Sequence, residues 1–124
     1  MSQEHYDTLV KTRKVPATRE TCISPIKGYS AKYDGVLVEF EVAPGTTKAL
    51  EAIGVRNNAG VVVEKYPNMP EVSKGWNEEK AFFKGEGKKG NKATDKGQIN
   101  IGLGTGKALE IFNKNIIKFK EVPK

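Results

Sequence analysis

Two tyrosines and a serine stand close together in the segment ISPIKGYSAKY, directly before the strand with the clearest alternation. Tyr29 and Tyr33 are four residues apart, and Ser24 precedes them in a Ser-Pro step. The spacing allows both tyrosines to seal one side of a helix against a sheet. Aromatic and hydroxyl side chains can also line a ligand cleft. This segment is therefore the first candidate for a binding site.

Metal centres and nucleophilic triads lack the residues they need. The chain has one histidine, His5, and one cysteine, Cys22, which cannot supply a structural zinc site. No carboxylates have the spacing of a calcium loop. A nucleophile at Cys22 or Ser24 would need His5 as its base, and nothing in the sequence marks that contact. We expect Cys22 to be a buried, inert thiol.

Two glycine- and lysine-rich segments offer weaker signals for anion binding. GLGTGK, residues 102–107, could bind a phosphate through backbone amides, but it lacks the spacing of a P-loop and favours a tight strand-to-helix turn. Lysines of the segment 84–96 could contact phosphates, or they could belong to a solvated charged loop.

Length and composition predict one small domain. The chain has 124 residues, 37% apolar content, 13 glycines and 6 prolines, which favours an α+β fold of short elements joined by turns. A net charge of +6 favours polyanions or an anionic cofactor as partners. No apolar run reaches the roughly 18–20 residues that span a bilayer, and no signal-peptide core is present.

Periodicity predicts short helices at residues 2–12, 48–53 and 108–116, the second capped by Thr46 or Thr47. In QINIGL we expect Ile99, Ile101 and Leu103 to face the core, with Gln98 and Asn100 on the other face. Strands are predicted for ETCIS, GVLVEFEV, GVVVEKY, QINIGL and IIKFKEV. KAFFKGE is predicted to be an edge strand, and the alternative for this region is one helical turn capped by Asn77.

The segment ISPIKGYSAKYDGVLVEFEVAPGTT resembles the mono-ADP-ribosyltransferase toxin domains of Rhs and other polymorphic bacterial toxins, including those that modify a translation elongation factor. In that family a strand ends in a Ser-x-Ser/Thr step, a short helix carries two tyrosines, and a V-x-V strand with a PG turn follows. The resemblance continues through ALEAIGVRN, GW and INIGLGTGKALEIFN. It implies an ADP-ribosyltransferase-like α+β fold with small mixed or antiparallel sheets and short helices, forming one domain over residues 1–124, and it implies NAD as cofactor.

The resemblance also implies site residues. Ser24 corresponds to the strand serine that orders the cleft, and Tyr29 and Tyr33 flank or stack on nicotinamide. Gln98 stands where the family places a residue of its Gln/Glu-x-Glu motif, and Glu86 has the right charge, so both are candidate catalytic residues.

Three departures from the family pattern accompany these assignments. Ile26 replaces a polar residue of the serine step, and no complete Gln/Glu-x-Glu motif is present. From the comparison with the family we also expect the sequence to begin at the first helix, without the preceding strand whose arginine grips the NAD phosphate. Arg13 or Arg19 is the candidate substitute for that arginine.

The implied function is an NAD-dependent toxin that acts on a translation factor or an RNA in the cytoplasm of a competing bacterium. Its other expected partner is a cognate immunity protein, and it is expected to be a monomer without a membrane partner. One alternative is a ribonuclease toxin that uses His5, Glu86 and lysines for acid-base work. Another is a binding module or inactive fragment of the same fold.

Overall fold

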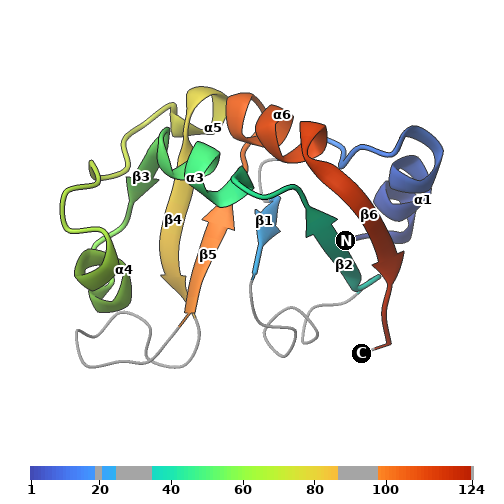
Figure 1. Ribbon diagram of the computed structural model, residues 1–124, viewed down its shortest axis with the longest axis horizontal. Coiled ribbons are helices and arrows are strands. Elements are labelled where there is room, and N and C mark those ends of the chain that lie inside the picture. The colour runs from blue at the N-terminus through green and yellow to red at the C-terminus, as the bar shows by residue number, and fades with distance from the viewer. Residues whose placement is uncertain (19–20, 25–34, 87–97, 124) are drawn as a thin grey trace.

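The computed structural model describes residues 1–18, 21–24, 35–86 and 98–123, and of Glu86 the backbone alone. These residues form short helices and two small sheets, which confirms the predicted α+β class (Figure 1). The first sheet has the strand order β1-β5-β4-β3 and the second pairs β2 with β6. The strands are β1 (Cys22–Ile23), β2 (Val38–Val42), β3 (Gly54–Arg56), β4 (Ala81–Glu86), β5 (Gln98–Gly102) and β6 (Ile116–Glu121).

Short helices cover the sheets. Helices α3 and α4 lie on one side of the four-stranded sheet, α6 leads from that sheet to β6, and α1 lies beside the two-stranded sheet (Figure 1). No helix of the described ranges has the length and apolar content needed to cross a bilayer. The helices are α1 (Gln3–Thr12), α3 (Thr46–Glu51), α4 (Gly60–Lys65), α5 (Trp76–Glu79) and α6 (Lys107–Lys114).

The register of β4 and β5 separates the two faces of the larger sheet. The strands are antiparallel, and Phe83 lies opposite Ile101. Since directly opposite residues share a face, both belong to the side that carries the core, where Phe83 is fully buried. The other face, called here the rear face, carries three successive pairs. They are Phe82 with Gly102, Lys84 with Asn100, and Glu86 with Gln98.

Several sequence predictions are confirmed. Helix α1 begins after Ser2, whose Oγ accepts a 3.1 Å hydrogen bond from the backbone N–H of His5. Helix α6 buries Ala108, Leu109 and Phe112 as its spacing predicted. Strand β6 follows it directly, and KAFFKGE contains strand β4. The predicted edge position of this strand is wrong, because β4 lies inside the sheet between β3 and β5.

The segment GVVVEKY is a helix, not the predicted strand. Val62 is fully buried, but Glu64 and Lys65 are both exposed, so burial does not keep the period of two that a half-exposed strand would show. The Asn57 side chain accepts a 3.2 Å hydrogen bond from Ala59 N–H and turns the chain into α4. A short apolar run is compatible with either structure, and here the preceding turn decides.

The cap predicted for the second helix is also wrong. Gly45, at φ +89°, is the N-cap residue of α3, and it supplies no side-chain hydrogen bond. Thr46 is the first residue of the helix, and its Oγ1 donates a 2.6 Å hydrogen bond back to the Ala43 carbonyl. The hydroxyl therefore stabilises the preceding turn and leaves the helix amides uncapped.

The faces of β5 are as predicted, since Ile99 and Ile101 pack against the core and Leu103 is fully buried, but the other face is buried too. Gln98 and Asn100 are buried, whereas Ile99 and Ile101 are only half-buried. The rear face is covered in part by α5, because the Trp76 ring packs against Phe82 with ring centroids 5.2 Å apart. Covering both faces of the sheet buries the polar side chains of β5 as well.

Cys22 is exposed and not buried as predicted. It lies on β1, a two-residue strand that pairs with β5 alone and forms an edge of the sheet. A side chain on an edge strand has a cross-strand neighbour on one side only, so less of its surface is covered.

The glycine-rich turn before α6 packs against α5. The Thr105 N–H donates a 2.8 Å hydrogen bond to the Asn77 carbonyl. Gly104 has φ +64°, and a Cβ at Gly104 or Gly106 would collide with the backbone of Asn77 or Glu78. The glycines thus allow two backbones to approach closely, which supports the strand-to-helix turn over a phosphate-binding loop.

Candidate functional site

Three polar side chains meet on the rear face of the four-stranded sheet. Gln98 Nε2 donates a 2.6 Å hydrogen bond to Ser24 Oγ and another, of 2.5 Å, to Asn100 Oδ1. Gln98 is 8% exposed and Asn100 is 1% exposed. We refer to Ser24, Gln98 and Asn100 as the amide cluster.

The sheet positions this cluster. Residues two apart on a strand point to the same face, so Gln98 and Asn100 are neighbours on β5. Strand β1 pairs antiparallel with β5, and Ile23 lies opposite Ile101. Ser24 comes directly after β1 and therefore lies next to the first residues of β5.

The cluster can hold a polar group by hydrogen bonds. Among the described residues, no hydrogen bond involves Gln98 Oε1 or Asn100 Nδ2. Buried polar atoms in proteins are nearly always satisfied by protein, water or ligand, so these two atoms offer one acceptor and one donor. Neutral amides do not transfer protons near pH 7. Their part in any reaction would be to bind and orient.

The structure brings together two of the residues predicted from the sequence, Ser24 and Gln98. The backbone of Glu86, a third, pairs with that of Gln98 on the adjacent strand β4. Tyr29 and Tyr33 lie outside the described residues, as do Ile26 and Arg19.

Arg13 lies on a different part of the molecule. It is the C-cap residue of α1, with φ +60°, and its guanidinium carbon lies 5.5 Å from the ring centroid of Phe119 on β6. No contact among the described residues links it to the amide cluster. Its predicted role in binding phosphate stays a prediction.

The ribonuclease alternative would combine His5 with Glu86. These two residues belong to separate parts of the fold. His5 is on α1, beside the two-stranded sheet, whereas Glu86 ends strand β4 of the larger sheet (Figure 1). The described residues contain no group of three or more histidine, cysteine or acidic side chains that could hold a metal ion.

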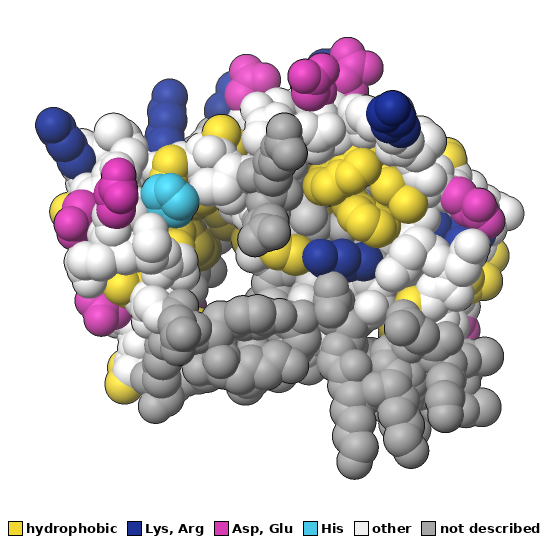
Figure 2. Space-filling view, turned by 180° about the vertical axis from the view of Figure 1, so that it is seen from behind, with side chains coloured by type: hydrophobic (Ala, Val, Ile, Leu, Met, Phe, Trp, Pro, Cys, Tyr) yellow, Lys and Arg dark blue, Asp and Glu magenta, His cyan; other side chains and the backbone are white. Residues whose placement is uncertain are grey.

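Three further residues share the rear face with the amide cluster, and the sequence did not place them at one site. Trp76, Phe82 and Lys84 are half-buried, and Lys84 Nζ lies 6.0 Å from the centroid of the Phe82 ring. Seen from behind, the molecule shows a hydrophobic patch with a basic side chain at its border (Figure 2). The alternation of KAFFKGE, which places residues 82, 84 and 86 on one face, was the available signal.

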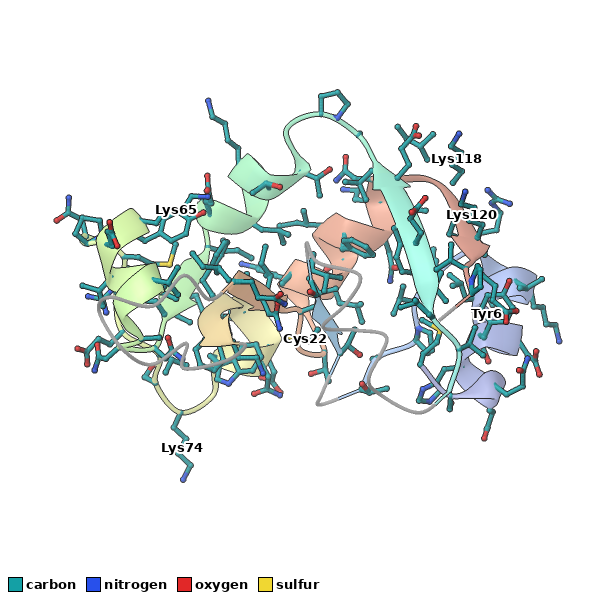
Figure 3. The ribbon with its side chains drawn as sticks, turned by 90° about the horizontal axis from the view of Figure 1, so that it is seen from below. Tyr6, Cys22, Lys65, Lys74, Lys118 and Lys120 are labelled. Atoms are coloured by element: carbon teal, nitrogen blue, oxygen red, sulfur yellow. The ribbon has the colours of Figure 1, made fainter. Side chains whose placement is uncertain are left out.

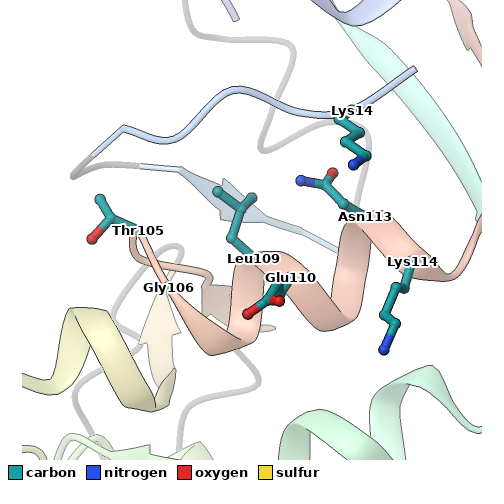
Figure 4. A pocket seen from close by; sticks show the side chains of 7 residues that line it. All are labelled: Lys14, Thr105, Gly106, Leu109, Glu110, Asn113 and Lys114. Carbon is teal, nitrogen blue, oxygen red and sulfur yellow. The ribbon is translucent and has the colours of Figure 1, made fainter. Parts of the chain in front are cut away.

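A groove of about 470 Å³ lies along α6, away from the predicted site residues. Asn113 is occupied there, since its side chain accepts a 2.8 Å hydrogen bond from Val15 N–H and donates a 3.1 Å one to Val15 O. Lys114 points away from Lys14, with Glu110 exposed on the same helix, so no basic cluster forms (Figure 4). The lining residues are Lys14, Thr105, Gly106, Leu109, Glu110, Asn113 and Lys114.

Among the described residues, Tyr66 has a clearly raised pKa, and its role is structural. Burial, and then the hydrogen bond and charge of Glu51, raise the pKa of Tyr66 to about 12. The Tyr66 hydroxyl donates to Glu51 Oε2 at 2.6 Å, and its ring packs edge-on against Phe83 of the core. The pair ties α3 to the end of α4.

The family model described as the PT3 toxin domain matches residues 1–121. A comparison with curated proteins finds no match.

Proposed function

Because the chain belongs to the PT3 toxin domain family, we propose that it is a toxin domain whose activity is NAD-dependent mono-ADP-ribosylation, acting on the translation apparatus of competing bacteria. The family membership supports the toxin role. The activity rests on the resemblance described above together with the geometry of the amide cluster.

The hydrogen bond between Gln98 and Ser24 is the observation that carries this proposal. The resemblance assigns the two residues to different motifs, one on an early strand and one at the entry of a late strand. In the structure their side chains are in direct contact, at 2.6 Å. Two motifs that build one site are expected to converge in this way.

NAD supplies an ADP-ribosyl group. The N-glycosidic bond of NAD breaks, and its electron pair leaves with nicotinamide. Ribose C1′ then bonds to an acceptor atom, which loses a proton. Gln98 Oε1 and Asn100 Nδ2 fit this substrate, because a ribose hydroxyl or a carboxamide can take both an acceptor and a donor. Hydrogen bonds directed at the sugar favour the reaction if they strengthen as positive charge develops there.

A negative charge near the ribose would balance the positive charge that develops there, and Glu86 is the candidate to supply it. Asn100 stands two residues after Gln98, where the family motif has a carboxylate, and an amide cannot balance positive charge on the sugar. The backbone of Glu86 lies opposite Gln98 in the β4–β5 register. We propose that the Glu86 carboxylate stabilises the developing charge and accepts the proton of the acceptor.

The test uses NAD labelled in its adenylate part, incubated with the purified chain and a bacterial lysate. The expected result is transfer of label to a protein or RNA, with release of nicotinamide. Ser24→Ala and Gln98→Ala should each lower the rate at least about tenfold, the effect expected from losing one well-placed hydrogen bond. Ser73→Ala and Gln3→Ala, at exposed positions, are the matched controls and should leave the rate unchanged.

A folded wild-type chain that neither transfers label nor releases nicotinamide would contradict the proposal. RNA cleavage without NAD would instead support the ribonuclease alternative. A toxin of this kind also implies a cognate immunity protein. Expression in bacteria should therefore arrest growth, and co-expression of the immunity protein should restore it.

A further inference from the structure

The rear face of the sheet carries three different chemical groups in a fixed order along β4 and β5. The Phe82–Gly102 pair comes first, and the Trp76 ring lies over it. The next pair on this face contains Lys84, and the last adjoins the Gln98 amide. Successive pairs on one face are about 6.6 Å apart, so the rings and the Gln98 end are separated by about 13 Å.

The two rings form a surface suited to an aromatic ligand. Trp76 and Phe82 meet edge to face, with centroids 5.2 Å apart at an angle of 63°, and both remain partly exposed. Gly102 permits this arrangement, because a Cβ there would approach the Trp76 ring to 3.1 Å. Partly exposed aromatic rings provide a stacking surface for a nucleobase.

A cation borders the rings on the side of the amide cluster. Lys84 Nζ lies 6.0 Å from the Phe82 ring centroid, and Lys84 is directly opposite Asn100 in the register. Its ammonium group is suited to contact phosphate. The order along the sheet is therefore aromatic surface, cation, amide cluster.

From this order we propose that Trp76 and Phe82 bind the adenine ring of a dinucleotide, with Lys84 contacting its phosphates. The inference rests on the proposed function, since the amide cluster then takes the nicotinamide ribose end. The order of groups on the sheet matches the chemical order of NAD, which is adenine, phosphates and nicotinamide riboside. Trp76 belongs to the GW segment that the resemblance includes, but the resemblance assigns no role to Trp76, Phe82 or Lys84.

The chain offers a direct readout, because Trp76 is its single tryptophan. Titration with AMP should change Trp76 fluorescence in a saturable manner, and nicotinamide mononucleotide should cause a smaller change. Lys84→Gln should weaken AMP binding about tenfold by removing a charge-assisted contact. Phe82→Leu should weaken it about three- to tenfold while keeping the reporter.

Lys74→Gln is the matched control. Lys74 precedes α5, is exposed, and points away from the body of the molecule (Figure 3). The Lys74→Gln variant should bind AMP with the same affinity as the wild type. Thermal unfolding of each variant shows whether it is folded, and the wild-type titration remains decisive even if one variant is not.

The outcomes separate this inference from the proposed function. Wild-type Trp76 emission that does not respond to millimolar AMP overturns the inference, even if NAD is cleaved. Equal AMP affinity in wild type and Lys84→Gln, or stronger binding of nicotinamide mononucleotide at Trp76, also overturns it. Saturable AMP binding without NAD cleavage supports the inference and contradicts the activity. Binding of single-stranded RNA that AMP does not displace would assign the patch to RNA and overturn the inference.

Discussion

The side chains of Gln98 and Ser24 lie 74 residues apart in the chain and 2.6 Å apart in space, with the amide donating to the hydroxyl oxygen. Gln98 is 92% buried, since only 8% of its surface is exposed. The Ser24 hydroxyl is therefore one of the two acceptors, with Asn100 Oδ1, of a buried amide nitrogen.

Replacing Ser24 measures how much its hydroxyl contributes to the stability of the fold. Ser24→Ala removes one of the two acceptors of the buried Gln98 amide, and we expect the free energy of unfolding to fall by about 1–3 kcal/mol. Ser24→Thr, which keeps the hydroxyl, should lose less. Urea unfolding at pH 7 measures both values, with Ser73→Ala as the control. Equal losses from the alanine and threonine variants would show that the hydroxyl does not matter.

A second prediction separates stability from function in the amide cluster. Asn100→Leu removes one acceptor of Gln98 and should destabilise the fold by about 1–3 kcal/mol. The double variant Gln98→Leu with Asn100→Leu removes both amides and should recover much of that loss, because no buried amide remains. The double variant should nevertheless no longer release nicotinamide from NAD. Unfolding midpoints and the NAD assay, run on the same samples, compare the two properties, and retained NAD cleavage would remove the amides from the site.

The turn before α6 gives a prediction about close backbone approach. Gly104 and Gly45 both have positive φ, but a Cβ at Gly45 meets nothing within 4 Å, whereas one at Gly104 collides with the backbone of Asn77. Gly45→Ala should cost about 1–2 kcal/mol from backbone conformation. Gly104→Ala should cost about 1–3 kcal/mol more, through overpacking. Equal unfolding free energies of the two variants would contradict the packing of α5 against this turn.

Tyr66 predicts a dependence of stability on alkaline pH. Its pKa is raised from 10.0 to about 12 in the folded state, so folding favours the neutral phenol. The resulting stability is fully present below about pH 10 and is lost as the pH rises towards 12. Tyr66→Phe should lower the free energy of unfolding by about 0.5–1.5 kcal/mol at pH 7.

The difference between wild type and Tyr66→Phe should then shrink between pH 10 and 12. Chemical unfolding at pH 7, 9 and 11 measures it, and the Tyr6→Phe variant controls for general tyrosine ionisation. A difference that stays constant up to pH 12 would mean that the contact with Glu51 does not hold the phenol neutral.

Local patterns in the sequence determined much of the secondary structure. Ser2 caps α1, the spacing of Ala108, Leu109 and Phe112 defines the buried side of α6, and alternation marks β5. These features depend on neighbours a few residues away, so they can be read from the chain directly. The strand prediction for the valines of α4 failed because a short apolar segment fits a helix as well as a strand. The turn at Asn57 that leads into the helix depends on a hydrogen bond of the folded chain.

The sequence also named Ser24 and Gln98 as separate candidates, each through its place in a resembling motif. Only the tertiary structure decided that they touch, because the pairing of β1 with β5 joins residues distant in the chain. The tertiary structure likewise decided that Gln98 and Asn100 are buried and that Trp76 and Lys84 share their face of the sheet. Alternation assigns residues to two faces, but it cannot say what covers either face, since that depends on packing between distant elements.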